Sequence, residues 1–117
     1  ALEEVGLLAH KKSLACSLSG GQVRLLELAR LKLSKGSMLL IDEPTAGVAP
    51  ALRNKLSEMI SFLNKENFTI IIVEHDLKFL FNLVDRVIVL VDGKKYMVGT
   101  PEEIRNDKRL QEIYFGS

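Results

Sequence analysis

The sequence predicts an α/β fold with a mainly parallel sheet. Short apolar runs typical of buried strands occupy residues 38–41, 68–73 and 87–91. Between them lie longer segments whose apolar residues recur at the spacing of a helix. Strands that alternate with helices in this way are usually parallel neighbours in one sheet. The 117 residues fall within the size range of a single domain.

One long helix is predicted in the first third of the chain. Residues 1–8 suggest a short helical piece, and residues 10–18 are polar and irregular. Residues 22–33 have helical spacing, and the pair Lys35-Gly36 is a typical helix end. The face of this helix that we expect to be buried comprises Val23, Leu26, Ala29, the stem of Arg30, and Leu33.

Two more helices are predicted between the strands. The first has Pro50 in its first turn, and Ala49 before it is a poor N-cap. A turn is expected at residues 64–67, and Asp76 is placed to cap the second helix. The inward residues are expected to be Leu52, Leu56, Met59, Ile60 and Leu63 in the first helix, and Leu77, Leu80, Phe81 and Val84 in the second.

The end of the chain is predicted to form a hairpin followed by helix. Asp92-Gly93 is a strong hairpin-turn signal, so residues 94–99 should return antiparallel with Tyr96 and Val98 on one face. Thr100 and Glu103 have the spacing of a capping box. We expect the tail to residue 117 to be helical.

Composition excludes several classes of function. Sixteen Lys and Arg balance fifteen Asp and Glu, and a net charge of +1 gives no case for nucleic-acid binding. The single cysteine has no partner for a disulfide or a metal site, which favours a reducing cytoplasmic setting. No apolar run is long enough to cross a bilayer. Any membrane association is therefore expected to come through a partner.

A candidate phosphate-binding site lies at the start of the first long helix. In Leu18-Ser19-Gly20-Gly21-Gln22, two glycines follow a serine and open a helix. Free backbone N–H groups and the helix dipole both favour an anion there, and the serine hydroxyl adds a donor. The structural alternative is a serine-capped helix after a glycine turn.

Candidate catalytic groups follow two of the predicted strands. Asp42 and Glu43 come directly after strand 38–41, and His75 follows strand 68–73. Ligands of open α/β sheets bind at the carboxyl ends of strands. There, Asp42 could hold Mg²⁺, Glu43 could take a proton from water, and His75 could bond to a phosphoryl oxygen. The alternatives are solvated surface acids and a capping or packing histidine.

The order of these motifs resembles the ATP-binding-cassette (ABC) family. Residues 18–22 match its signature motif, residues 39–43 its Walker B strand, and residues 44–50 its D-loop. His75 matches its switch histidine. Residues 46–50 and 111–116 are most similar to ATPase subunits of branched-chain amino acid importers. The family usually has aspartate at the position of Ala49.

The resemblance implies a partial P-loop NTPase (RecA-like) core with a C-terminal β-hairpin and helices. Residues 1–35 would end a helical subdomain that carries the signature motif, and residues 36–117 would form the C-terminal part of the ATPase core. The sequence contains no Gly-x-x-x-x-Gly-Lys-Ser/Thr, so the Walker A loop is missing. We therefore expect a fragment of a longer subunit that is inactive alone, or a chain that dimerises through an unpaired strand edge.

The resemblance also implies the role of each site residue. Asp42 would position Mg²⁺, Glu43 would activate water, and His75 would contact the γ-phosphate of ATP. Ala46 and Gly47 would belong to the D-loop. The residues that would bind the γ-phosphate of an ATP held by a second ABC ATPase subunit, identical or different, are Ser19, Gly20, Gly21 and Gln22.

The implied partners place the protein peripherally at the cytoplasmic face of the membrane. Besides the second ATPase subunit they are integral membrane permease subunits, with no nucleic acid and no contact with the transported molecule. Two other functions remain open. One is a soluble ABC ATPase that acts without a permease, and the other is a non-catalytic assembly or regulatory module.

Overall fold

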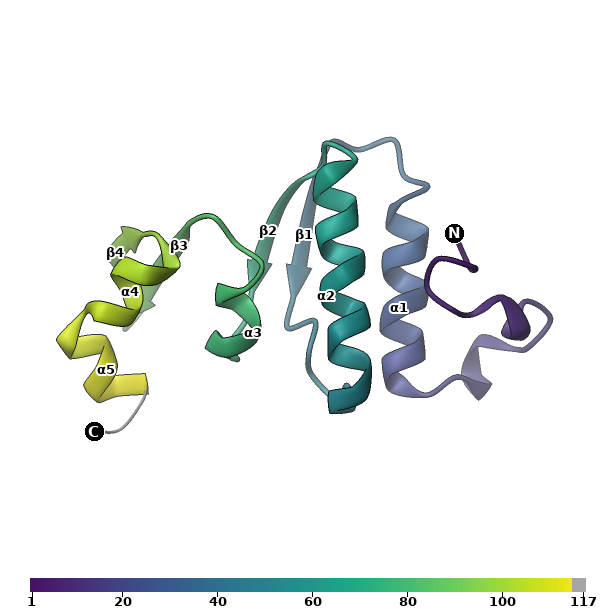
Figure 1. Cartoon of the computed structure of the whole chain (residues 1–117), viewed down its shortest axis with the longest axis horizontal. Coiled ribbons are helices and arrows are strands. Elements are labelled where there is room, and N and C mark those ends of the chain that lie inside the picture. Colours follow the sequence, from purple (N-terminus) through teal and green to yellow (C-terminus); the bar gives the residue numbers. More distant parts are fainter. Residues whose placement is uncertain (115–117) are drawn as a thin grey trace. The chain divides into compact units, whose positions relative to one another are not determined.

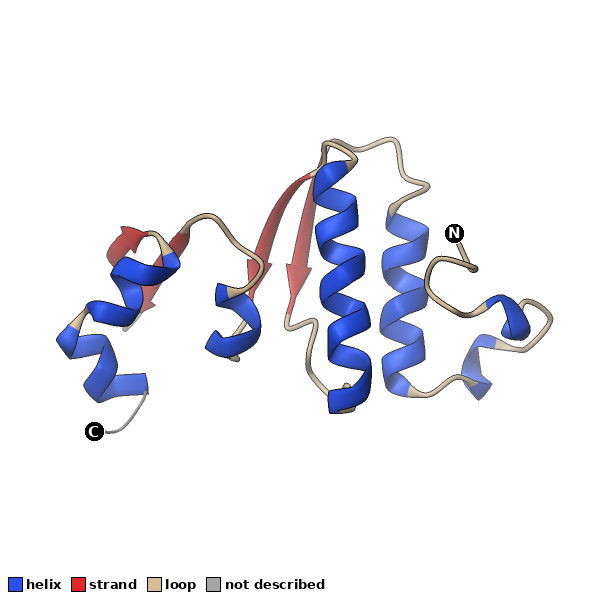
Figure 2. Ribbon diagram, in the orientation of Figure 1, coloured by secondary structure: helices blue, strands red, loops and turns tan. Residues whose placement is uncertain are grey.

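The computed structural model describes residues 1–114, which form two compact units that divide after Leu80 (Figure 1). The first unit contains two long helices and a two-stranded sheet. The second contains a β-hairpin and two short helices (Figure 2). Helix and strand alternate through the first unit, where the two strands pair in parallel, so the predicted α/β class is confirmed. No helix within residues 1–114 is long and apolar enough to span a membrane.

The N-terminal segment forms turns instead of the helix predicted for residues 1–8. Its only helical pieces are the short 3₁₀ turns Leu8–His10 and Ala15–Ser17. Gly6 has a φ of +68°, a left-handed conformation that a right-handed helix cannot include, so the chain turns there. The turns bury Val5 and Leu7 nonetheless.

Helix α1 spans Gly20–Leu31, and its buried face differs from the predicted one. Arg30 and Leu33 are exposed, because the helix ends before Leu33 and is rotated relative to the predicted face. The residues that it buries are Gly21, Leu25, Leu28 and Ala29. At Gly21 the helix comes so close to its neighbour that an added Cβ would lie 2.6 Å from Leu52 Cδ1.

Helix α2, Pro50–Lys65, lies beside α1 in the same unit (Figure 1). Four of the five predicted inward residues are buried, namely Leu56, Met59, Ile60 and Leu63, and Leu52 is half-buried. The helix continues two residues into the turn predicted at 64–67. The left-handed φ of +68° at Asn67 marks the turn itself.

Ala49 caps α2 without a side-chain hydrogen bond, as predicted. Its extended backbone, with φ −59° and ψ 142°, suits a capping side chain. We expect Ala49→Asp to raise the free energy of unfolding by about 1 kcal/mol, because the carboxylate would accept a bond from a free N–H group of the first turn. Urea denaturation measures the change. Ala51→Asp, inside the same turn, is the control, and an equal gain there would show a charge effect without capping.

Strands β1, Met38–Asp42, and β2, Thr69–Val73, pair in parallel, with Leu40 opposite Ile71 and Asp42 opposite Val73. We expected both strands to be buried on both faces. Instead one face of the sheet is open, and Leu40 and Val73 are 77% and 61% exposed. The opposite face, which contains the buried Leu39, is covered by helices. Parallel sheets normally have a layer of helices on each face.

Helix α3, Leu77–Phe81, is short, about one and a half turns, and begins directly after Asp76. Asp76 Oδ1 accepts a hydrogen bond of 3.0 Å from the Phe79 N–H group, so the predicted cap is confirmed. Leu80 and Phe81 are buried, as expected. Val84 lies beyond the end of the helix and is half-buried.

In the second unit, β3, Val87–Val91, and β4, Lys94–Gly99, form the predicted antiparallel hairpin. Asp92 and Gly93 have φ values of +50° and +73°, as the predicted turn requires. Helices α4, Pro101–Asn106, and α5, Lys108–Tyr114, follow it. The capping box of Thr100 and Glu103 at α4 is confirmed. The rest of the predicted helical tail, residues 115–117, lies outside the described residues.

The hairpin does not place Tyr96 and Val98 on one face as predicted. The register shifts between Val89 and Leu90, so Tyr96 has no partner on β3. An extra residue in one strand reverses the alternation of side chains beyond it. Tyr96 therefore contacts Asp107 and Arg109, whereas Val98 is exposed opposite Ile88.

Candidate active site

The carboxyl ends of β1 and β2 bring two predicted catalytic residues together. The last ladder bond runs from the Glu43 N–H group to the Val73 carbonyl at 2.8 Å. His75 Nδ1 then lies 3.6 Å from Glu43 Oε1, and both side chains are largely exposed. This distance is too long for a direct hydrogen bond. The two groups are thus close enough to contact one small ligand, and both are open to solvent.

Glu43 adopts an unusual backbone conformation. Its φ is +43°, in the left-handed region that residues with a Cβ rarely occupy. Such a conformation costs of the order of 1–3 kcal/mol and tends to occur at functional sites. The left-handed turn ends β1 and directs the chain into the loop of residues 44–48, where Ala46 N–H donates to the Glu43 carbonyl.

A buried carboxylate that sequence reasoning missed lies beside His75. The Glu74 side chain has 0% exposed surface. Its Oε2 accepts bonds from the hydroxyl and N–H groups of Thr45, at 2.8 and 3.2 Å. Its Oε1 accepts bonds from the N–H groups of His75 and Asp76, at 2.9 and 3.1 Å. The only sequence signal was a carboxylate directly between an apolar strand and a helix cap.

These hydrogen bonds determine the charge state of Glu74. Burial alone would raise the pKa of its carboxyl group above the usual value of 4.5. The bonds from Asp76, Thr45 and His75 favour the charged form, and they outweigh burial so that the pKa is lowered. Glu74 is therefore an anion at neutral pH, with His75 Nδ1 3.4 Å from its Oε1.

The lowered pKa of Glu74 predicts a specific loss of stability in acid. A carboxyl group whose folded pKa lies below its unfolded value stabilises the fold above the unfolded value. We expect that stabilisation to disappear as the pH falls below 4.5 through the folded pKa. Urea denaturation of the chain and of its Glu74→Gln variant, over pH 3 to 7, measures it.

The difference in free energy of unfolding between the chain and this variant should be largest near neutral pH and shrink in acid. Glu4 and Glu103 also have lowered pKa values, through hydrogen bonds with Lys32 and with the Thr100 backbone respectively. Both carboxyl groups are present in the chain and in the variant, so their effects cancel. A difference that stays constant with pH would contradict the lowered pKa of Glu74.

The predicted phosphate-binding segment forms the N-terminus of α1. Ser19 Oγ accepts a bond of 3.3 Å from the Gln22 N–H group, and Gln22 Oε1 accepts one of 2.8 Å from the Ser19 N–H group. This reciprocal capping box is the serine-capped helix start that was the structural alternative to a phosphate site. It is compatible with anion binding, because the hydroxyl keeps its own proton for donation. Gly21 has a packing role, at the close contact with Leu52.

One of the two predicted D-loop residues, Gly47, lies next to this helix start. Gly47 has a φ of +68°, and its carbonyl oxygen would be 3.6 Å from a Cβ added at Gly20. Ala46 and Gly47 are both exposed. Among residues 1–114, the side-chain hydrogen bonds of Ser19 and Gln22 involve each other and His10 and do not reach Asp42, Glu43 or His75. The candidate residues thus form two groups, one at the sheet edge and one at α1.

Asp42 is the candidate magnesium ligand. Its side chain is exposed at the end of β1, and it makes no hydrogen bond or ion pair within the described part of the chain. No cluster of three or more His, Cys, Asp or Glu side chains suited to a metal occurs among those residues. Magnesium in nucleotide sites is commonly held by one or two carboxylates plus phosphate oxygens. A single free carboxylate fits that donor set.

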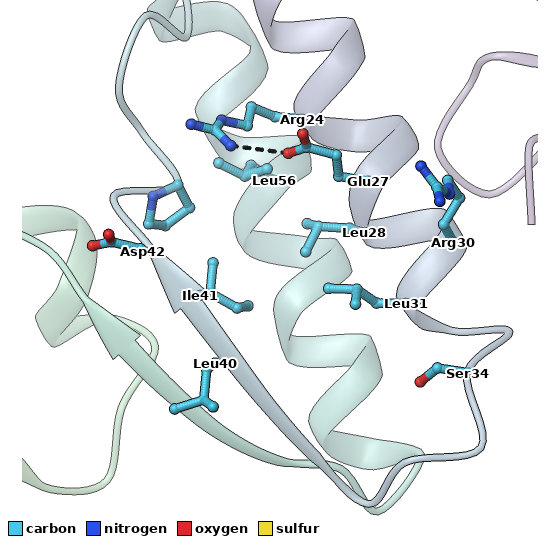
Figure 3. Close-up of a pocket in the computed structure, with 11 residues that line it drawn as sticks. Arg24, Glu27, Leu28, Arg30, Leu31, Ser34, Leu40, Ile41, Asp42 and Leu56 are labelled. Atoms are coloured by element: carbon cyan, nitrogen blue, oxygen red, sulfur yellow. Dashed lines mark hydrogen bonds and ion pairs between the residues drawn. The ribbon is translucent and has the colours of Figure 1, made fainter.

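A cavity of about 510 Å³ lies between α1, β1 and α2 (Figure 3). Leu28, Leu31 and Ile41 line it, and the ion pair between Arg24 and Glu27, at 2.9 Å, is part of its wall. Of the predicted site residues only Asp42 reaches it. The cavity is therefore separate from the pair of Glu43 and His75.

Comparison with known proteins gives concordant results. Residues 1–46 match the family model described as ABC transporter. The chain is 40% identical over 116 residues to the high-affinity branched-chain amino acid transport ATP-binding protein LivG of Salmonella typhimurium, covering 98% of this chain and 46% of LivG. It is 30% identical to the lipopolysaccharide export system ATP-binding protein LptB of Haemophilus influenzae, covering 98% of this chain and 48% of LptB.

A solved structure agrees with these relatives. The ADP conformation of MJ1267, an ATP-binding cassette of an ABC transporter, superimposes with a TM-score of 0.84 at 35% identity. The match covers 99% of this chain and 47% of MJ1267. The fold is thus that of part of an ABC ATPase core, with a small parallel sheet and a β-hairpin. The chain resembles ABC transporter ATP-binding proteins over nearly its whole length, among them proteins named for branched-chain amino acid transport. It spans about half the length of these relatives.

Proposed function

We propose that this chain supplies the Walker B, switch and signature residues of an ATP-hydrolysing subunit of an ABC importer for branched-chain amino acids. The observation that carries the proposal is the approach of Glu43 and His75 to 3.6 Å at the ends of neighbouring parallel strands. The likeness to LivG supports the transported class. Because the chain spans about half of that relative and has no Walker A sequence, we propose that it is the C-terminal part of a longer subunit.

The site residues have distinct roles in the proposed reaction. Glu43 orients the attacking water and takes its proton, and His75 donates a hydrogen bond to the γ-phosphate. Asp42 would hold Mg²⁺, which when bound would neutralise charge on the phosphates. Ala46 and Gly47 belong to the proposed D-loop, in which Ala46 N–H bonds to the Glu43 carbonyl and the Gly47 carbonyl lies near Gly20. The residues proposed to bind the γ-phosphate of an ATP held by a second ATPase subunit are Ser19, Gly20, Gly21 and Gln22.

The proposed partners follow from this division of the site. Because the signature residues are proposed to bind an ATP that another subunit holds, the site needs a second nucleotide-binding subunit, identical or different. Transport requires integral membrane permease subunits, so the proposed location is peripheral, at the cytoplasmic face of the membrane. No contact with the transported amino acid is proposed.

Calorimetric titration with Mg-ATP tests the proposal. The chain is compared with a form extended at its N-terminus to include a Walker A loop. We expect tight binding and ATP hydrolysis by the extended form only, because the Walker A amides and lysine supply most of the phosphate contacts. Tight binding by the 117-residue chain itself would contradict this account of the site.

Two further measurements separate the alternatives. Co-purification with a membrane permease would support transport, whereas an active ATPase without a permease would indicate a soluble ABC ATPase. An extended form that binds no nucleotide would indicate an assembly or regulatory module. The chain is also similar to LptB, whose name refers to lipopolysaccharide export, so the class of transported molecule needs its own test. That test is whether leucine stimulates ATP turnover by the complete transporter.

A further inference from the structure

The buried carboxylate of Glu74 requires an explanation of its own. Its side chain has 0% exposed surface, whereas those of Glu43 and His75 are 55% and 74% exposed. Burying a carboxylate is costly unless hydrogen bonds compensate the loss of water. None of the roles assigned above to the site residues uses Glu74.

The hydrogen bonds of Glu74 join two loops that the sheet does not connect. The ladder between β1 and β2 ends with the bond from Glu43 N–H to the Val73 carbonyl. Beyond that point, Glu74 Oε2 accepts two bonds from Thr45, and Oε1 accepts the N–H groups of His75 and Asp76. Thr45 is itself 4% exposed. Beyond the end of the strands, the Glu74 carboxylate thus links the two loops in place of a further backbone hydrogen bond of the sheet.

Each catalytic candidate is adjacent to one end of this bridge. Glu43 is two residues before Thr45, and His75 directly follows Glu74. Asp76 is held in addition by Arg53, whose Nη1 lies 2.7 Å from Asp76 Oδ2. The loop after β2 is therefore fixed to α2 on one side and, through Glu74, to the loop after β1 on the other.

We propose that Glu74 is a positioning residue that holds Glu43 and His75 at their mutual distance for ATP hydrolysis. It acts through the backbone of residues 43–45 and 74–76 and does not contact nucleotide. The role of Glu74 in ATP hydrolysis rests on the proposed function, but the hydrogen-bonded bridge between the loops can be tested without nucleotide. A fold-stabilising role alone would lower stability and leave the turnover of the folded protein unchanged.

Hydrogen exchange of the 117-residue chain, followed by NMR, tests the bridge. In Glu74→Gln the amide oxygen still accepts from His75 and Asp76, but its NH₂ group faces the Thr45 N–H group and cannot accept from it. We expect the Thr45 amide to exchange about 10-fold faster or more, relative to the Glu43 amide in the sheet ladder. The His75 and Asp76 amides should change less.

Thr45→Val gives a second measurement if Glu74→Gln does not fold. It removes only the hydroxyl bond, so the Thr45-position amide should remain bonded and the effects of the two changes should be non-additive. Glu58→Gln and Thr69→Val, the same chemical changes at exposed positions of α2 and β2, are the controls. If the exchange rate of the Thr45 amide relative to that of the Glu43 amide is the same in the chain and in Glu74→Gln, the proposed bridge is wrong.

Turnover of the complete subunit tests the positioning role. We expect Glu74→Gln to lower kcat about 10-fold or more while KM for ATP changes by less than about 3-fold, since misplacement affects the transition state more than binding. An unchanged kcat in a folded variant would overturn the positioning role. A wild-type subunit without ATPase activity would instead overturn the proposed function, and the exchange result would still decide the bridge.

Discussion

Replacing Glu43 by Gln in the complete subunit is expected to lower ATP turnover by about 10²–10⁴-fold, with ATP binding retained. A positioned general base contributes a factor of this size. Gln has nearly the same shape as Glu but cannot accept the proton of the attacking water. Because the substitution keeps a side chain of equal branching at φ +43°, the backbone cost of this position is unchanged. Single-turnover phosphate release and nucleotide titration separate the two effects.

The exposed residue Glu58 on α2 provides the matched control. Glu58→Gln makes the same change of charge away from the strand ends and should leave turnover within about 2-fold, as surface substitutions usually have small effects. Retained turnover in Glu43→Gln would remove Glu43 from the role of base. Loss of ATP binding in the same variant would show that its charge is needed earlier, at nucleotide binding.

Leu63→Ala is expected to cost about 2–5 kcal/mol of unfolding free energy, the usual range for truncating a fully buried leucine. Leu63 has 0% exposed surface near the C-terminal end of α2. With total stabilities of about 5–15 kcal/mol for small domains, such a loss would unfold much of the population. The midpoint and slope of urea denaturation, followed by circular dichroism, measure it.

Leu33→Ala removes the same atoms from a side chain that is 73% exposed just beyond α1. Its expected effect is below about 0.5 kcal/mol. Similar losses for the two substitutions would mean that the core of the first unit is not centred on α2. A changed denaturation slope in Leu63→Ala would indicate an altered denatured state or lost two-state behaviour.

The elements with strong local signals were predicted well from the sequence. Pro50 fixed the start of α2, and Asp92-Gly93 fixed the turn of the hairpin, because each residue limits the backbone by itself. The predictions that failed depend on other parts of the molecule. The rotation of α1 is set by its contact with Leu52, and the bulge at Tyr96 by pairing between strands. The open face of β1 and β2 depends on which layers cover the sheet.

The sequence also predicted where Glu43 and His75 meet, since strand ends in a parallel sheet share one edge. It gave no sign that Glu74 bridges the two loops, because that requires a long-range contact with Thr45. The roles of all the site residues, Glu43 and His75 included, stay predictions, as does the division of the chain at residues 35 and 36. The compact units of the structure divide elsewhere, after Leu80.

The open face of the first sheet has a consequence for how the stability of this chain should be measured. Leu40, Ile71 and Val73 are apolar and solvent-exposed there. A partner that covers these side chains in the folded form, and does not bind the unfolded chain, raises the apparent stability by mass action, by about 2.7 kcal/mol at a hundredfold excess over Kd. In the presence of such a partner the melting temperature becomes a function of concentration, and a single value has meaning only with the protein and partner concentrations at which it was obtained.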